Sequence, residues 1–305
     1  MIYDLAILGG GPAGVSAGVY SARKQLKTAF ITKDFQGQSS VSDEVQNWIG
    51  TIKISGTDLS KSLENHLKAY SGDFVDIFED NYVTKISKED DLFKIETNSS
   101  SFLSKTVLIT TGSHRRKLDV KGADIFENKG ITYCASCDGP LFSGQDVVVI
   151  GGGNAAFESS AQLLAYCKSV TLLNRTDKFK ADEITVEKLR KNPKMKIITN
   201  AQLTEVFGEK FVSGLRYKDL SGDIQEVKTS GIFVEIGALP TTEFAKDILE
   251  LNSFGYIIVD PKNQRTKTLG IWSAGDCTDG LYHQNNIASG DAIKALEDIY
   301  VYLHA

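Results

Sequence analysis

Two stretches of the chain share one arrangement of apolar and small residues. Residues 4–8 (DLAIL) and 147–150 (VVVI) are short and almost wholly apolar, which is typical of strands buried in a parallel sheet. Each leads at once into a run of glycines and then into a segment rich in small residues, over 15–24 and 157–166. Such a segment favours a helix packed closely on the sheet. The repeat predicts an α/β fold with two strand–turn–helix units.

The segments around these units have other periodicities. Leu59, Leu63 and Leu67 recur at helical spacing, whereas residues 73–110 alternate as short strands. Residues 211–217 and 224–228 flank a Ser-Gly-Asp turn and predict a hairpin. Near the C-terminus we expect a short strand that ends in Gly275-Asp276 and a final helix over 286–303.

Two polar or glycine-containing stretches mark the changes between domains. Ser113–Lys117 predicts a crossover into a second domain, and Gly237–Pro240 predicts the exit from it. A chain of 305 residues exceeds the usual size of one domain. We therefore expect residues 1–114 and 242–305 to form one domain, with residues 115–241 inserted as a second.

Both glycine runs match the dinucleotide-binding fingerprint in its strand–turn–helix context. Glycines allow a tight turn and a close backbone approach, and the helix N-terminus offers NH groups to a pyrophosphate. The second run carries alanine at the third glycine position, a variant that keeps this geometry. For either run alone, a glycine-rich turn without a ligand is the alternative. The candidate residues are Gly9, Gly11, Pro12, Ala13 and Gly14 in the first run, and Gly151, Gly153, Asn154, Ala155 and Ala156 in the second.

The residues after the second strand of each unit indicate which ribose is bound. In the first unit Lys33 stands where an acid is usual, and Asp34 could replace that acid only with a local shift. In the second unit Asn174 is followed by Arg175, with Lys180 a few residues on. An arginine here favours the 2′-phosphate of NADPH over the free hydroxyl of NADH. A solvated surface pair is the alternative for Arg175 and Lys180.

A C-x-x-C pair followed by an acid, Cys134-Ala135-Ser136-Cys137-Asp138, precedes the second glycine run. A structural zinc site needs four ligands, but Cys167 and Cys277 are single and far apart, and no suitable histidine pair follows. We therefore expect no metal and interpret Cys134 and Cys137 as a redox pair. Cys277 is interpreted as a small packing residue.

Composition excludes several classes of partner. The net charge of −5 and the pI near 5.5 provide no basic excess for nucleic acid. No apolar run reaches the roughly 18 residues of a membrane span, and no export signal precedes the first strand. We expect a cytoplasmic protein that binds neither nucleic acid nor membrane.

Across nearly its whole length the chain resembles the low-molecular-weight thioredoxin reductases and the related reductase core of the alkyl hydroperoxide reductase flavoprotein. The matching stretches are Gly9–Gly14, Gly37-Gln38, Val45–Gly50, Thr110–Gly112, Cys134–Gly139, Gly151–Ala156 and Ala274–Cys277. The resemblance implies two Rossmann-like domains, with the first binding FAD and the inserted second binding NAD(P)H. It also implies a homodimer, a rotation of one domain against the other, and a thioredoxin-like protein as substrate.

The resemblance also assigns roles to particular residues. It implies that Cys137 sits against the flavin, that Cys134 forms the mixed disulfide with the substrate, and that Asp138 serves the thiolate as acid and base. For FAD it implies contacts from Gln38, Asn47, Thr111, Gly112, Gly275, Asp276 and the backbone near Gln284.

The chain departs from the thioredoxin reductases at several positions. Asn174-Arg175-Thr176 and Lys180 replace the usual His-Arg-Arg and a later arginine, and His283 and Asn285-Asn286 are also unusual. The alkyl hydroperoxide reductase branch prefers NADH, but its extra N-terminal domains are not expected here because the FAD fingerprint starts at Gly9. Three functions stay open: an NADPH-dependent reductase of a thioredoxin-like protein, an NADH-dependent reductase of a separate glutaredoxin-like or peroxiredoxin-linked carrier, and a flavin-binding redox sensor.

Overall fold

The computed structural model describes residues 1–42 and 44–305 and divides the chain into two compact units. Unit 1 consists of Met1–His114 and Leu239–Ala305, and unit 2 consists of Arg115–Ala238. The sequence predicts changes of domain at 114/115 and 241/242, and the chain passes between the two units at 114/115 and 238/239. The strands at these two positions, β7 (Ser113–Arg115) and β16 (Ala238–Pro240), pair as a two-stranded sheet.

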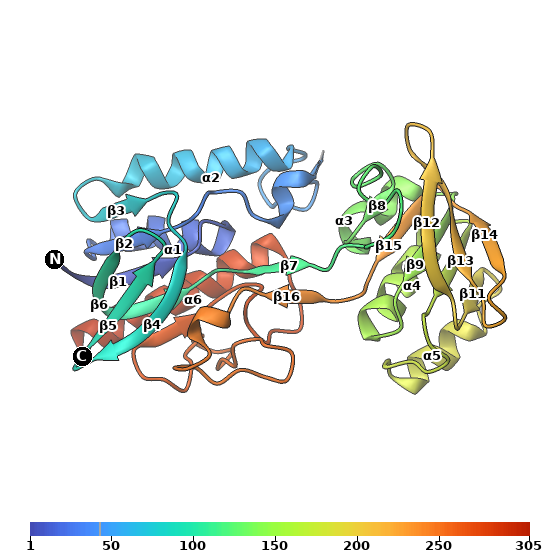
Figure 1. The fold of residues 1–305 in the computed structure, drawn as a ribbon. Coiled ribbons are helices and arrows are strands. Elements are labelled where there is room, and N and C mark those ends of the chain that lie inside the picture. Colours follow the sequence, from blue (N-terminus) through green and yellow to red (C-terminus); the bar gives the residue numbers. More distant parts are fainter. Residues whose placement is uncertain (43) are drawn as a thin grey trace. The chain divides into compact units, whose positions relative to one another are not determined.

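Unit 1 is built on a seven-stranded sheet whose central strands are parallel (Figure 1). Its order is β3 (Val75–Phe78), β2 (Thr28–Ile31), β1 (Ile2–Leu8), β6 (Ser101–Ile109), β5 (Leu92–Thr97) and β4 (Val83–Glu89). The short strand β17 (Ile271–Ser273) pairs with the end of β6 in parallel, and β4 and β5 are antiparallel to their neighbours. The carboxyl ends of β1, β6 and β17 therefore meet at one edge.

Three helices cover one face of this sheet. They are α1 (Pro12–Arg23), α2 (Gly56–Ser71) and α6 (Asn285–His304), and α1 packs against both of the others. Leu5 and Ile7 of β1 point into the core beneath these helices, whereas Ala6 and Leu8 face a second core. The second core is closed by β4, β5 and the segment around the short 3₁₀ helix Glu243–Ala245. Another 3₁₀ turn, Gln38–Val41, packs against α2.

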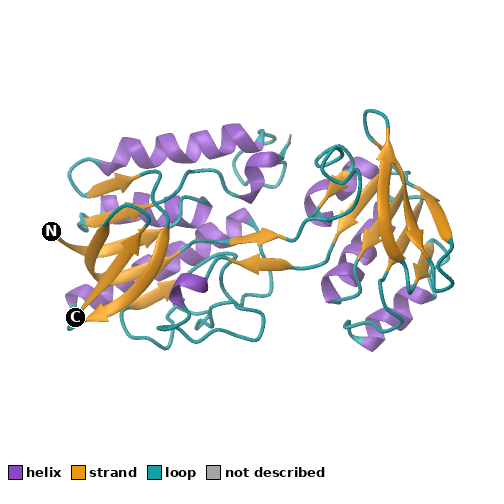
Figure 2. Ribbon diagram, in the orientation of Figure 1, coloured by secondary structure: helices purple, strands orange, loops and turns teal. Residues whose placement is uncertain are grey.

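Unit 2 repeats this plan on a smaller scale (Figure 2). Its parallel sheet has the order β11 (Met195–Ile198), β10 (Ser169–Leu173), β9 (Asp146–Ile150), β15 (Gly231–Val234) and β8 (Ile131–Thr132). The helices α4 (Asn154–Tyr166) and α5 (Glu183–Arg190) share a core with one face. A three-stranded antiparallel sheet of β12 (Gln202–Gly208), β13 (Val212–Lys218) and β14 (Ile224–Lys228) shares a core with the other. The short α3 (Ala135–Asp138) and the 3₁₀ turn Gly139–Phe142 pack against α4.

The fold class is confirmed, including two units of the same α/β plan with one inserted in the other. The predicted hairpin is present as β13 and β14, and β12, which was not predicted, adds a third strand to it. That strand has mixed burial rather than strict alternation, so its period-2 signal is weak. No helix in the described residues is long and apolar enough to cross a membrane.

The last helix, α6, is fixed to the rest of unit 1 by a polar cluster. The Asp298 carboxylate accepts hydrogen bonds from Arg265 Nε at 2.5 Å and from Trp272 Nε1 at 2.8 Å. Trp272 is only 1% exposed, so its indole NH depends on this partner.

We predict that Asp298→Ala lowers the free energy of unfolding of unit 1 by about 1–3 kcal/mol, because a buried donor loses its acceptor. The matched control is Glu297→Ala on the same helix, which removes only a surface ion pair with Lys24 and is expected to change stability by less than about 1 kcal/mol. Denaturant titration of both variants measures the difference, and equal effects would contradict the anchoring role.

Candidate functional site

The first glycine run brings three backbone segments into contact. Gly9 has a φ of +114°, and a Cβ there would lie 2.5 Å from the carbonyl oxygen of Thr110 on the neighbouring chain segment. A Cβ on Gly14 would lie 1.8 Å from the carbonyl oxygen of Gly9, so this glycine is needed for the helix to approach the turn. A Cβ on Gly11 would meet nothing within 4 Å. Gly11 therefore borders open space at the N-terminus of α1, where a pyrophosphate fits.

A cavity of about 560 Å³ opens over this turn within unit 1. Nine of the predicted FAD-contacting residues line it: Gly9, Gly11, Pro12, Ala13, Gln38, Thr111, Gly112, Gly275 and Asp276. Gly14, Asn47 and Gln284 are not among the lining residues. A cavity of this size, with a glycine cradle at a helix N-terminus, fits a large nucleotide cofactor such as FAD.

Side chains from distant parts of unit 1 pair with one another, and Gln38 and Asp276 do so at the cavity. Gln38 Nε2 donates to Asp276 Oδ2 at 3.0 Å and to Ser113 Oγ at 3.2 Å. Asn47 Nδ2 donates to Gln284 Oε1 at 2.9 Å. The structure thus joins Gln38 with Asp276 and Asn47 with Gln284, four residues that the sequence singled out separately.

The two unusual asparagines take part in the same contacts. Asn285 exchanges hydrogen bonds with the Ser39 hydroxyl at 2.8 and 3.1 Å, and Asn286 Nδ2 donates to the Asn47 carbonyl at 2.6 Å. The start of α6 is therefore held to the segment after β2 by amide side chains.

The sequence did not predict some of the residues that line the cavity. Asn81, Tyr82 and Val83 at the start of β4, together with Thr241 and Phe244, border the same cavity. Their positions depend on how β4 and the returning chain pack, and no local motif marks them.

The second glycine run has the same geometry as the first. A Cβ on Gly151, whose φ is +149°, would lie 2.3 Å from the carbonyl oxygen of Glu235. A Cβ on Gly153 would meet nothing within 4 Å, so open space again borders a helix N-terminus. Ala156, fully buried, takes the third glycine position, and its Cβ would lie 3.1 Å from one on Gly151. These residues fit the pyrophosphate of a second dinucleotide.

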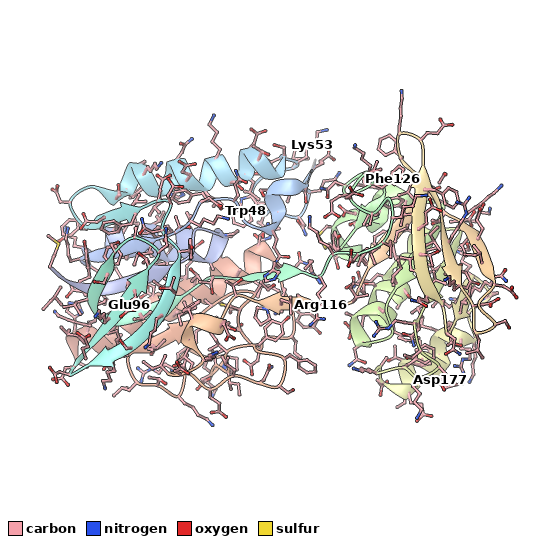
Figure 3. The ribbon with its side chains drawn as sticks, in the orientation of Figure 1. Trp48, Lys53, Glu96, Arg116, Phe126 and Asp177 are labelled. Carbon is pink, nitrogen blue, oxygen red and sulfur yellow. A yellow bond between two sulfur atoms is a disulfide. The ribbon has the colours of Figure 1, made fainter. Side chains whose placement is uncertain are left out.

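The loop after β10 folds back onto this turn. Lys180 N donates to the Gly152 carbonyl at 2.7 Å, and Asp182 N donates to Asn154 Oδ1 at 2.8 Å. Asn174 Nδ2 donates to the carbonyls of Thr176 and Lys178, both at 2.9 Å, and thereby fixes the loop that also carries Asp177 (Figure 3). Arg175 and Lys180 are exposed on this loop, so two cations stand beside the second cradle.

The redox pair forms a disulfide at the start of α3. Cys134 is the N-cap residue, its Sγ is bonded to that of Cys137, and it accepts a hydrogen bond from the Cys137 backbone NH at 3.1 Å. Cys137 is exposed and Cys134 is half-buried. Cys167 and Cys277 are buried and free, which confirms the packing interpretation of Cys277.

Asp138 lies in the last position of α3, beside this disulfide in the chain. Its carboxylate accepts a hydrogen bond from the Thr132 hydroxyl, whose oxygen in turn accepts from the Cys134 NH at 3.4 Å. Burial raises the pKa of Asp138, and the Thr132 hydrogen bond opposes that rise. A carboxyl group with a raised pKa keeps its proton to higher pH and is a better proton donor to a thiolate.

We predict that Thr132→Val raises the pKa of Asp138 further, because the ionised carboxylate loses a hydrogen-bond donor. The proton is then held to higher pH, and the Asp138-dependent limb of the pH–rate profile for exchange between the reduced pair and a small disulfide moves to higher pH. Ser136→Ala is the matched control, since its hydroxyl donates to Gln162 instead. An unchanged limb in Thr132→Val, or the same shift in the control, would count against this role.

The different surroundings of Gly11 and Gly14 lead to a further prediction. Gly14→Ala should lower the free energy of unfolding by about 1–3 kcal/mol or more, because its methyl group overlaps the Gly9 carbonyl. Gly11→Ala should leave stability nearly unchanged but weaken FAD retention, since its methyl group projects into open space. Thermal unfolding and flavin absorbance after gel filtration separate the two effects. Equal loss of stability in both variants would refute the distinction.

Comparisons with known proteins agree with this geometry. Residues 3–292 match the pyridine nucleotide-disulphide oxidoreductase family. A thioredoxin reductase from Streptococcus pyogenes has a similar structure, with a TM-score of 0.91 and 32% identity, covering 99% of this chain and 98% of that one.

Two curated relatives are longer proteins. A component of the alkyl hydroperoxide reductase of Escherichia coli is 40% identical over 304 residues, and a protein named NADH dehydrogenase from Bacillus subtilis is 39% identical over 303 residues. Each match covers 99% of this chain but only 58% of the relative. With its two cradles and its cysteine pair, the chain has the two-domain fold of FAD- and NAD(P)H-dependent oxidoreductases. The chain belongs to the pyridine nucleotide-disulphide oxidoreductase family.

Proposed function

We propose that the protein is a disulfide reductase that passes electrons from NADPH, through FAD and the Cys134–Cys137 pair, to the disulfide of a thioredoxin-like protein. The observation that carries the proposal is a disulfide with one exposed cysteine, Cys137, in the same unit as a second dinucleotide cradle. The likeness to thioredoxin reductases over almost the whole chain supports the substrate class.

The residues of unit 1 would hold FAD. Gly11 and the N-terminus of α1 would receive its pyrophosphate, and the joined pair of Gln38 and Asp276 would offer polar atoms on the cavity rim. When bound, FAD accepts a hydride equivalent from the nicotinamide and releases two electrons to a disulfide.

The cysteine pair would carry these electrons outward. Two electrons and two protons convert the Cys134–Cys137 disulfide into two thiols. The Cys134 thiolate would then attack one sulfur of the substrate disulfide, and Cys137 would resolve the mixed disulfide, releasing the substrate as a dithiol. Asp138 would supply and recover the proton of the thiolate, which its burial and its bond to Thr132 suit it to do.

Arg175 and Lys180 are the residues that favour NADPH. Both project from the loop that Asn174 fixes beside the second cradle, where a 2′-phosphate would need cations. A second candidate function is NADH-dependent reduction of a separate glutaredoxin-like or peroxiredoxin-linked carrier. The names of the two longer relatives favour it, since one is named an NADH dehydrogenase and the other is part of an alkyl hydroperoxide reductase.

We predict that Cys134→Ser abolishes NADPH-dependent reduction of a thioredoxin-like protein, because the attacking sulfur is gone. Flavin reduction by NADPH should persist in this variant. Cys277→Ser is the matched control, because that buried cysteine lies in the core of unit 1 and forms no disulfide. Undiminished turnover in Cys134→Ser would refute the proposal.

The nucleotide preference is tested by anaerobic stopped-flow bleaching of the flavin with equal concentrations of NADPH and NADH. We expect NADPH to bind more tightly than NADH and to reduce the flavin faster. In Arg175→Ala, NADPH binding should weaken about tenfold, whereas NADH binding should not change. Lys188→Ala on α5 is the control for a general loss of surface charge. A preference for NADH in the unaltered protein would favour the second candidate, and bleaching by neither nucleotide would favour a redox sensor.

A homodimer and a cytoplasmic location stay predictions. Light scattering after gel filtration checks the first.

A further inference from the structure

Glu235 is a buried carboxyl group that the mechanism above does not use. It follows β15 directly, at the carboxyl edge of the parallel sheet in unit 2, and is only 8% exposed. Because β15 pairs with β9, its backbone lies against the turn that leads from β9 into α4. The carbonyl oxygen of Glu235 is the atom that a Cβ on Gly151 would strike at 2.3 Å. The group therefore adjoins the second dinucleotide cradle.

The side chain of Glu235 is held by two partners. Ser159 Oγ donates to Oε1 at 2.6 Å, and Arg115 Nη1 lies 3.8 Å from Oε2. Ser159 is the sixth residue of α4, so it lies about 8 Å along the helix axis from Asn154, the first. Arg115 is the first residue of unit 2. The carboxylate thus stands beneath the same helix whose N-terminus forms the cradle.

The charges around Glu235 act in opposite directions. Burial raises its pKa, and the exposed Glu158 adds to the rise, whereas the Ser159 hydroxyl and Arg115 lower it. A further negative charge nearby would favour the protonated form. The pyrophosphate of a dinucleotide brings two such charges to the N-terminus of α4, about 8 Å along the helix axis from Ser159, which holds the carboxylate.

We propose that Glu235 takes up a proton from solvent when a dinucleotide binds at the Gly151–Gly153 turn, so that nucleotide affinity and protonation of this carboxyl group are linked. The proposal rests on the proposed function only in taking the second cradle as a dinucleotide site. Linkage then requires that the dinucleotide bind more weakly as pH rises through the range in which Glu235 ionises in the free protein.

The test is calorimetric titration of the FAD-loaded protein with NADP⁺ in two buffers of different ionisation enthalpy, repeated over a series of pH values from acid to neutral, and the comparison is made at the pH of greatest proton uptake. The dependence of the binding enthalpy on the buffer gives the number of protons taken up. Glu235→Gln keeps the volume of the side chain and an acceptor for Ser159, but it cannot titrate. Because the 2′-phosphate of NADP⁺ exchanges the same protons with both proteins, the difference between them isolates Glu235. We expect a difference of about 0.3–1 proton per nucleotide bound.

Two further variants sharpen the outcome. Glu187→Gln on α5 removes an exposed carboxylate that pairs with Arg190, and it should take up as many protons as the unaltered protein. Ser159→Ala removes a donor that favours the ionised form, so Glu235 should be more protonated before binding and take up less. This variant keeps the test decisive if Glu235→Gln fails to fold.

The results distinguish failure of this proposal from failure of the proposed nucleotide-binding function. Tight binding with the same proton uptake in the unaltered protein, Glu235→Gln and Ser159→Ala would overturn the proposal and leave the nucleotide site intact. Absence of NADP⁺ and NAD⁺ binding in the unaltered protein would overturn both.

Discussion

The contact on which both dinucleotide sites depend is a close approach of backbone to backbone at the glycine turns. In unit 1 the Thr110 carbonyl oxygen lies so close to Gly9 that a Cβ there would be 2.5 Å away. In unit 2 the Glu235 carbonyl oxygen would lie 2.3 Å from a Cβ on Gly151. Each approach sets a helix N-terminus over the carboxyl edge of a parallel sheet, and the NH groups there are left for a ligand. The residue two positions on, Gly11 or Gly153, borders open space, so the turn is closed on one side and accessible on the other.

The two units surround this common turn with different chemistry. In unit 1 amide side chains and carboxylates border the cavity: Gln38 meets Asp276, and the start of α6 is tied to the segment after β2 through Asn285 and Asn286. The result is a deep cavity of about 560 Å³, which suits a cofactor that stays bound. In unit 2 an exposed loop with Arg175 and Lys180 borders the turn, which suits a nucleotide that must enter and leave. The anchoring of α6 by Asp298 matters for the first case, because the cavity rim depends on that helix.

In two carboxyl groups of unit 2, Asp138 and Glu235, burial raises the pKa and a hydroxyl donor, Thr132 or Ser159, opposes the rise. Asp138 stands next to the disulfide and Glu235 next to the Gly151 turn. Each acid therefore lies at a place where the proposed chemistry would change the local charge. A pair of buried acids, each tuned by one hydroxyl, is a simple way to handle protons in a reaction that moves electron pairs.

The sequence by itself determined the fold class, the two glycine turns and the redox pair, because each is a local pattern whose physical cause lies within a few residues: apolar strands, a glycine cradle, two thiols at helix spacing. Only the tertiary structure decided which distant residues meet. Gln38 joins Asp276 across 238 positions of chain, and Asn81, Thr241 and Phe244 reach the same cavity. Their contacts follow from how strands and returning segments pack, for which no short motif exists. The burial of Glu235 could not be predicted from the sequence for the same reason, because a glutamate after a strand is ordinarily solvated. Here α4 packs over the side chain through Ser159, and Arg115 lies beside it.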